Sequence, residues 1–540
     1  MGRFLVGSGL FCIWLAASSA TAKDHFLTIG GGPRPDNNQV SLERNVLLQQ
    51  QVLAAQRLDK PAYELYFADG SDEARDLQYR ASKFRVTCPP ARRMMAEVLG
   101  DEESMDLLYR NHQLPNVEGP SDPQLVRRRM RRLAKELQAG DRLIVYATAH
   151  GGKAKSPAKN RDEEKSETNK YDTSLYFWES ETVAASEFAG WLDRLSPEVT
   201  VVLVMVQCYA GGFAHTIFHE ADADLGLAPH ARCGFFAQVH DRGAAGCTPD
   251  VDEADYQEYS TFFWSALGGR SRTGETIDTA DYDQNGTVSF AEAHAYAVIE
   301  SDTVDVPVRT SDELLRKYSE LGTKNAESAK DKAAASQPAL LELAGSLTTF
   351  TENARPEERA ILEGLSKKLQ LEEPVTIEAA REKLKRLKEE SDTADGKVAQ
   401  AKRGARQALT RVQNDVYEVW PELKARYSPV AMELTSERAD EFVKRVEEMS
   451  SYAALLKARE REDKRTDEQL DLLRQEAKVE RLLRTAENVA LATNLPHVAP
   501  EEIVARYDKL RALEDGTLAP QPSPETSAQT EPAAISGEGK

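Results

Sequence analysis

The sequence predicts an α/β domain with a mostly parallel sheet flanked by helices, followed by an all-α helical region. Two almost uninterrupted apolar runs, 143–149 and 199–206, suit strands that are buried on both faces of such a sheet. Beyond Ser311 the composition changes to abundant Ala, Glu, Lys, Leu and Arg, and apolar residues recur at helical spacing. We expect an antiparallel bundle of several helices there, with breaks at Pro374, Gly396, Pro421 and Pro429.

The length of 540 residues exceeds what one compact core accommodates, so two or three domains are expected. We predict a signal peptide over 1–22, the α/β domain over 23–311 and the helical domain over 312–516. Residues 517–540 are rich in Pro, Ser, Thr, Glu and Ala, which predicts a disordered tail. The net charge of -20 would repel nucleic acid, whereas calcium or basic peptides would be attracted.

The N-terminus has the features of a targeting segment. Arg3 precedes an apolar stretch from Phe4 to Ala17, and the small-x-small pattern that ends at Ala22 suits a signal peptidase. The alternative is an uncleaved membrane anchor, although the apolar stretch is shorter than the ~20 residues that a span requires. No later segment reads as membrane-spanning. We therefore expect a secreted or periplasmic protein.

Four cysteines remain after cleavage, in a compartment that is expected to be oxidising: Cys88, Cys208, Cys233 and Cys247. If Cys208 stays free, a disulfide between Cys233 and Cys247 is the expected pairing. The sequence alone leaves other connectivities open.

The α/β alternation begins directly after the signal peptide. Residues 25–29 predict a first strand, and the glycines at 30–32 predict a tight turn toward a helix over 41–58. These glycines lack the Gly-Lys-Ser/Thr ending of a phosphate-binding loop. A second strand is expected from residue 63, followed by a helix over 124–138 and further strands near 174–180 and 233–239.

The two apolar runs each end in a residue that can do chemistry. The run 199–206 is followed by Cys208, and the Gly211-Gly212 pair predicts a sharp turn into a helix whose N-terminus would favour the thiolate. The run 143–149 is followed by His150. Because open α/β sheets carry their reactive groups at the carboxyl ends of the strands, adjacent strands would set His150 beside Cys208.

These motifs resemble those of the caspase, legumain and gingipain group of cysteine peptidases, and legumains in particular. A His-Gly pair, His150-Gly151, closes one strand, and Gln207-Cys208-Tyr209-Ala210-Gly211 follows the next at the expected separation. The match departs from the group because no Ala separates Gln207 from Cys208 and because Val206 stands where legumains carry an acidic residue. Substrate preference is therefore not carried over.

The resemblance implies a caspase-like fold over 24–311 and cleavage of peptide or protein substrates. It implies that His150 is the general base, that Cys208 is the nucleophile, and that the N–H groups of Gly151 and Cys208 stabilise the oxyanion. Asp241 lies where related peptidases form the wall of the primary specificity pocket, which makes it a candidate pocket carboxylate. Legumains also carry a helical region that covers the active site, so residues 312–516 are expected to limit access. A chain ending near Ser311 would then be more active.

Two other interpretations stay open. The peptidase-like domain could be an inactive scaffold of a calcium-binding interaction protein that contacts a protein partner through its helical domain. Alternatively, His150 and Cys208 could be core residues that are unrelated in space.

A twelve-residue stretch from Asp281 to Glu292 fits the loop of an EF-hand at every diagnostic position. It offers oxygen ligands at positions 1, 3, 5, 9 and 12, a glycine at position 6 and an apolar residue at position 8. The predicted Ca²⁺ ligands are Asp281, Asp283, Asn285, the Thr287 carbonyl, Ser289 and Glu292. The alternative is an acidic turn that binds no ion. A single site suggests a structural or regulatory role rather than a paired sensor.

Overall fold

The computed structural model describes residues 23–58, 62–81, 87–100, 102, 104–155, 169–322, 339–425 and 427–518. The predicted signal peptide lies outside the described residues, as does the predicted tail beyond residue 518. Across those described ranges, no helix is both long enough and apolar enough to cross a membrane.

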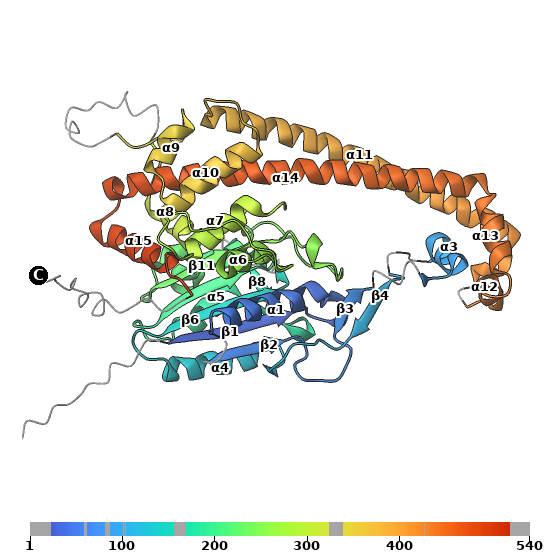
Figure 1. Cartoon of the computed structure of the whole chain (residues 1–540), viewed down its shortest axis with the longest axis horizontal. Helices are drawn as coiled ribbons and strands as arrows, with labels where there is room; N and C mark the ends of the chain where they lie inside the picture. The colour runs from blue at the N-terminus through green and yellow to red at the C-terminus, as the bar shows by residue number, and fades with distance from the viewer. Residues whose placement is uncertain are drawn as a thin grey trace, which may run out of the picture.

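A seven-stranded sheet forms the centre of the α/β part (Figure 1). Six neighbouring strands run parallel and the edge strand β12 runs antiparallel to β11. In spatial order the strands are β12 (Val308–Arg309), β11 (Arg232–Phe236), β10 (Thr200–Met205), β6 (Arg142–Ala149), β1 (Asp24–Gly31), β2 (Tyr63–Phe67) and β5 (Val117–Gly119). This arrangement confirms the predicted class.

Helices cover both faces of the sheet, which explains why the central strands are mostly apolar on both faces. In β10, Val201 and Leu203 face one layer and Val202 and Val204 face the other, because successive side chains of a strand alternate. The first layer holds α4 (Pro123–Glu136) and α5 (Ala185–Leu192). The second holds α1 (Val40–Ala55), α6 (Tyr259–Gly268), α7 (Phe290–Glu300), α8 (Thr310–Tyr318) and α15 (Glu501–Glu514).

Smaller elements complete the α/β part. β3 (Leu77–Arg80) and β4 (Leu107–Arg110) form an antiparallel pair. A second small sheet contains β7 (Gly151–Gly152), β8 (Ser174–Tyr176) and β9 (Thr182–Ala184). A 3-10 helix, η3 (Ala210–Ile217), follows β10 after a short turn.

The helical region confirms the prediction of an all-α domain, and two long antiparallel helices dominate it. These are α11 (Ile377–Val419) and α14 (Ser450–Val498), which form a hairpin that packs on α7 and on the short helices α9 (Leu347–Asn353) and α10 (Pro356–Lys368). The predicted break at Gly396 is wrong, since this residue lies inside α11, where an exposed glycine costs only about 1 kcal/mol relative to alanine. Pro421 does follow the end of α11, because proline cannot supply the next backbone hydrogen bond.

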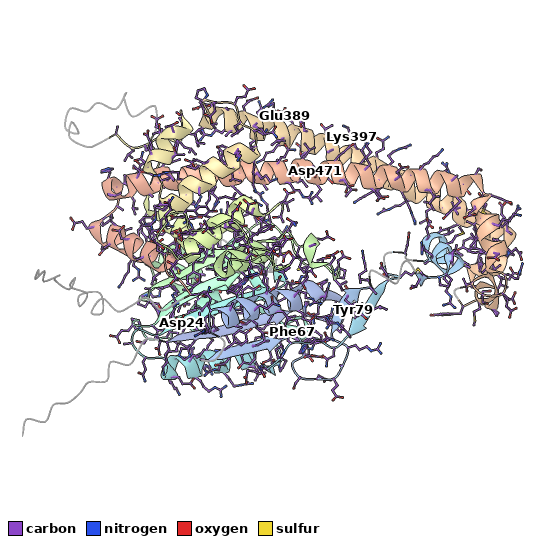
Figure 2. The ribbon with its side chains drawn as sticks, in the orientation of Figure 1. Asp24, Phe67, Tyr79, Glu389, Lys397 and Asp471 are labelled. Carbon is purple, nitrogen blue, oxygen red and sulfur yellow. The ribbon has the colours of Figure 1, made fainter. Side chains whose placement is uncertain are left out.

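The tip of the hairpin has its own apolar cluster, which includes α12 (Pro429–Leu434), α13 (Ala439–Glu447) and α3 (Pro90–Leu99). Helix α3 belongs to the α/β part, and Gln413 Nε2 donates to its Val98 carbonyl at 2.9 Å. Arg459 also pairs with Glu97 at 3.0 Å. In Figure 2, Asp24 marks the start of β1 and Phe67 the end of β2, so the hairpin and α3 extend beyond the carboxyl edge of the sheet.

The base of the hairpin shares the core of the sheet. Leu491, Leu495 and Leu510 belong to the same apolar cluster as Phe26 and Ile144. Thr517 forms an isolated β-bridge with Ser289, and Leu518 is buried. These two residues, which were predicted to start the disordered tail, therefore belong to the folded part of the chain.

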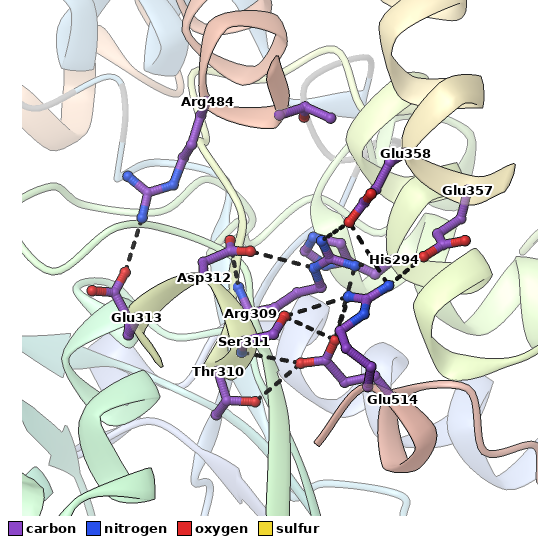
Figure 3. A network of polar contacts seen from close by, with 12 residues as sticks. His294, Arg309, Thr310, Ser311, Asp312, Glu313, Glu357, Glu358, Arg484 and Glu514 are labelled. Carbon is purple, nitrogen blue, oxygen red and sulfur yellow. Dashed lines mark hydrogen bonds and ion pairs between the residues drawn. The ribbon is translucent and has the colours of Figure 1, made fainter. Parts of the chain in front are cut away.

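A buried network of charges crosses the predicted domain boundary (Figure 3). Arg309 of β12 pairs with Glu358 of α10 at 2.9 Å, and Ser311 Oγ donates to Glu514 of α15 at 2.9 Å. Arg511 pairs with the same Glu514 at 2.6 Å. A chain ending near Ser311 would leave buried charges without partners and would expose the apolar core, both of which are costly.

Candidate active site

The topology brings His150 and Cys208 to the same edge of the sheet. Strands β6 and β10 are neighbours and run parallel, and Ala147 is in register with Met205. His150 follows the last residue of β6, and Cys208 lies three residues after the end of β10. The two segments touch through their backbones. A Cβ atom on Gly151 would overlap the Cys208 carbonyl oxygen, so this position accepts only glycine.

The turn after Cys208 depends on a strained residue rather than on the predicted glycine pair. Tyr209 has a φ of 60°, in the left-handed region that costs a non-glycine residue about 1 kcal/mol or more. Its N–H donates to the Arg242 carbonyl at 2.9 Å and its carbonyl accepts from Thr173 Oγ1 at 2.9 Å, which stabilises this conformation. Gly211 and Gly212 do not have positive φ values. They are needed because other backbone segments approach them closely.

Hydrogen bonds determine which nitrogen of His150 can act as a base. Nε2 lies 2.8 Å from the Asn37 carbonyl and 3.0 Å from Gln39 Oε1, and both partners only accept. The proton is therefore assigned to Nε2, which leaves Nδ1 with its lone pair as the acceptor nitrogen. Burial lowers the pKa of His150, although the Asn37 carbonyl opposes this shift. The imidazole is thus neutral and able to accept a proton around pH 7.

The Cys208 thiol faces the loop 238–247, which we call the site loop. The Ala244 N–H donates to Cys208 Sγ at 3.2 Å, and this donor favours the thiolate. Burial raises the pKa of Cys208 and outweighs the effect of this donor. The thiol is consequently neutral at rest. No direct hydrogen bond joins Cys208 to His150, so the two side chains must come closer before a proton passes between them.

A second thiol, which was predicted as a disulfide partner and not as a site residue, lies beside the imidazole. Cys247 Sγ is 3.8 Å from His150 Nδ1, and Cys247 is exposed to solvent. Cys88, Cys208, Cys233 and Cys247 are all free. The expected pairing of Cys233 with Cys247 is wrong, since Cys233 is buried in β11 whereas Cys247 lies at the carboxyl edge.

Asp241, the predicted pocket carboxylate, lies in the site loop, and its carboxylate points largely to solvent. The side chain is 63% exposed and lies 3.9 Å from Arg242 Nε, which is a weak contact. Two residues of the same loop that were not predicted, Ala244 and Cys247, contact the candidate dyad directly. A backbone N–H leaves no signature in the sequence, and an isolated cysteine could have many roles.

The loop from Asp281 to Glu292 is folded into a compact turn around its first acidic residue. Asp281 accepts from the N–H groups of Asn285 at 3.0 Å and Gly286 at 2.9 Å, and Gly286 has a φ of 91°, which suits only glycine. Ligand atoms of Asp281, Asp283 and Glu292 lie within 4.8 Å of one another. Three converging carboxylates repel one another, and a hard divalent cation with oxygen ligands would relieve that repulsion.

The end of this loop is also the start of α7. Ser289 and Glu292 form a capping box, in which the Ser289 side chain accepts from the Glu292 N–H and the Glu292 carboxylate accepts from the Ser289 N–H at 2.9 Å. Residues 269–280 before the loop are not helical, so the loop has the exiting helix of an EF-hand and lacks the entering one. Within the loop, Asn285 Oδ1 accepts hydrogen bonds from both the N–H and the hydroxyl of Thr287, so these two predicted ligands lie in one turn.

Comparisons with known proteins identify no family. No family model and no curated protein match the chain. Among solved structures, the chain is similar to protein GSU0716 from Geobacter sulfurreducens, with 9% sequence identity and a TM-score of 0.23. That similarity covers 42% of this chain and 76% of the other and is too low to carry an argument.

Proposed function

We propose that the protein is a secreted or periplasmic cysteine endopeptidase that acts on peptide or protein substrates through Cys208 and His150. One observation carries this proposal: the segments that follow two neighbouring parallel strands hold the histidine and the cysteine, and the backbones of these segments are in contact. Open α/β sheets form their reactive sites at this edge. The short motifs that resemble the caspase and legumain group support the same assignment.

In the proposed reaction, His150 Nδ1 removes the thiol proton, and Cys208 Sγ attacks the carbonyl carbon of the scissile bond. The N–H groups of Gly151 and Cys208 stabilise the negative oxygen that forms. The C–N bond then breaks, and His150 transfers its proton to the departing amine. Water, deprotonated by His150, hydrolyses the thioester and releases the acid product together with the free thiol. The Nε2 contact with Asn37 stabilises the imidazolium because its carbonyl dipole faces the positive ring.

We further propose that the loop from Asp281 to Glu292 binds one Ca²⁺ ion, with the ligands predicted from the sequence. The arrangement of Asp281, Asp283 and Glu292 suits a hard cation. The ion would connect the loop to α7 and, through the Ser289–Thr517 bridge, to the C-terminal end of the described chain. Its role would then be structural or regulatory rather than catalytic.

A short peptide carrying a thiol-reactive electrophile in place of the scissile bond tests the peptidase proposal. We expect labelling of Cys208, identified by peptide mass spectrometry, and a fall of about a hundredfold in His150→Ala because general-base catalysis contributes on that order. Cys247→Ser is the matched control and should still be labelled at Cys208. Labelling confined to Cys247, or labelling of Cys208 that is the same in His150→Ala, would contradict the proposal.

A second candidate function is a catalytically inactive, calcium-binding protein that binds a partner through its helical region. Of the five exposed large apolar side chains in the described residues, four lie on the hairpin between 419 and 456. They are Val419, Tyr427, Met432 and Leu456. A concentration of exposed apolar side chains in one segment of the chain is a feature of binding surfaces. Failure of the peptide probe to label Cys208, together with partner binding that is lost in Tyr427→Ser with Met432→Ser, would favour this function.

A further inference from the structure

The site loop is held against Cys208 by hydrogen bonds of its backbone. Besides the Ala244 N–H that reaches Sγ, the Arg242 carbonyl accepts from the Tyr209 N–H. Gln238 Nε2 donates to the Gly243 carbonyl at 2.9 Å, which closes the loop on itself. The position of the donor that stabilises a thiolate therefore depends on the position of the whole loop.

A buried carboxylate, Asp305, supports the loop from behind. Asp305 is 0% exposed, and its Oδ1 accepts from the Ala245 N–H at 2.9 Å and from Gln238 Nε2 at 3.2 Å. Oδ2 accepts from Thr303 Oγ1 at 2.9 Å. Oδ1 therefore binds the site loop through one backbone N–H and one side-chain amide, and Oδ2 binds the hydroxyl of Thr303 in its own segment.

Helix α14 of the helical region holds this support in place. Arg481 is 2% exposed, and its guanidinium donates to the carbonyls of Asp305 at 2.6 Å and Thr303 at 3.0 Å. It also donates to the carbonyls of Val298 at 3.0 Å and Ser301 at 2.8 Å. A guanidinium with five donors in one plane is suited to such a task, because a single side chain can fix several acceptors at once.

The residue before Arg481 contacts the loop itself. Glu480 Oε2 lies 2.6 Å from Arg242 Nη2, whereas the other oxygen of the same carboxylate pairs with Lys388 of α11 at 3.0 Å. Glu480 is only 14% exposed, so this pair is partly shielded from solvent. Consecutive residues of α14 therefore contact both the site loop and the segment behind it.

We propose that α14 positions the candidate nucleophile through the site loop, with Glu480 and Arg481 as positioning residues. The role assigned to Cys208 in this inference rests on the proposed function. The helical region is then a permanent part of the site, which differs from the expectation of a cover whose removal increases activity. The shared core and the charge network at Ser311 agree with this view.

The inference predicts that weakening the α14 contact lowers the reactivity of Cys208. Burial has the largest effect on the thiol and raises its pKa. The Ala244 N–H opposes this effect and lowers the pKa, whereas the charge of Asp305 adds to it. A site loop that moves away from Cys208 loses the donor first, because a hydrogen bond weakens steeply with distance and angle. The thiolate fraction near neutral pH would then fall.

The experiment measures the second-order rate of alkylation of Cys208 by iodoacetamide between pH 6 and pH 9, using the full-length protein and peptide mass spectrometry to separate Cys208 from Cys247. We expect Glu480→Gln to slow the reaction at pH 7 by about three- to tenfold, equivalent to a pKa rise of up to about one unit. Lys388→Gln is the matched control, because it removes the other ion pair of the same carboxylate and leaves the contact with Arg242 in place. It should change the rate by less than about twofold.

The charge exchange Glu480→Arg with Arg242→Glu should restore the rate, which a purely structural loss would not do. Equal rates in Glu480→Gln and the unchanged protein, or equal losses in Glu480→Gln and Lys388→Gln, would overturn the inference. All rates are compared at a temperature where melting curves show each variant fully folded. Alkylation requires no peptidase activity. A normal alkylation response without labelling by the peptide probe would therefore refute the proposed function and leave the positioning role intact.

Discussion

The replacement Leu495→Ala tests whether the helical region and the sheet form one cooperative unit. Leu495 of α14 is 0% exposed and belongs to the cluster that contains Phe26, Ile144 and Val202 of the sheet. Removing a leucine side chain at such a site costs about 2–5 kcal/mol, from lost transfer free energy and from the cavity that remains. We take about 3 kcal/mol as the central expectation.

Hydrogen exchange measured by mass spectrometry can locate this loss. If the strands open only together with α14, amide exchange in β10 should accelerate by roughly a hundredfold, since 1.4 kcal/mol corresponds to a factor of ten. Leu455→Ala is the control on the same helix. Leu455 is also 0% exposed but belongs to the cluster at the hairpin tip, so exchange should accelerate in α12 and α13 and stay unchanged in β10.

The reasoning would be refuted if Leu495→Ala left exchange in β10 unchanged while α14 and α15 opened. The helical region would then fold separately, and a chain ending near Ser311 could retain the sheet. Equal acceleration in β10 for both variants would also contradict the assignment of Leu455 to a separate cluster.

Three further predictions follow from single positions. Gly151→Ala should reduce probe labelling of Cys208 by about a hundredfold, because the added Cβ displaces the Cys208 backbone; labelling at the unchanged rate would contradict the close approach. In the unchanged protein, calcium at a hundred times its dissociation constant should stabilise the fold by about 3 kcal/mol, with no such gain for Asp283→Ala in the same calorimetric scan. Although burial alone would raise the pKa of Glu313, its contacts with His215 and neighbouring arginines lower that pKa to about 2. The Glu313 carboxylate should therefore contribute about 3 kcal/mol to the free energy of unfolding above pH 4.5, and this contribution should be lost as the pH falls toward 2. In urea titrations, Glu313→Gln should lose less stability between pH 6 and pH 3 than the unchanged protein does.

Local patterns in the sequence were sufficient to predict the sheet and the edge at which the candidate dyad lies. A strand buried on both faces is apolar at nearly every position, and 143–149 and 199–206 show that pattern with one threonine each. The twelve-residue spacing from Asp281 to Glu292 predicted a turn with converging carboxylates because the ligands of one ion can come from one short loop.

Positions that depend on packing could not be predicted in this way. The break expected at Gly396 is absent because the hairpin partner α14 stabilises α11 along its length, and tertiary contacts outweigh one weak helix former. The pairing expected for Cys233 and Cys247 is absent because the topology buries one residue in a strand and places the other at the carboxyl edge.

The sequence by itself determined which residues can do chemistry and at which ends of the strands they stand, since both follow from residue type and from the period of a strand. The tertiary structure alone decided what surrounds Cys208. The Ala244 N–H, the Asp305 carboxylate and the guanidinium of Arg481 come from segments up to about 270 residues away from it, and nothing in their local sequence marks them. Such contacts form only in the folded protein. A charged side chain can be buried only where hydrogen-bond partners compensate for the loss of water, and those partners come together only when distant segments have packed.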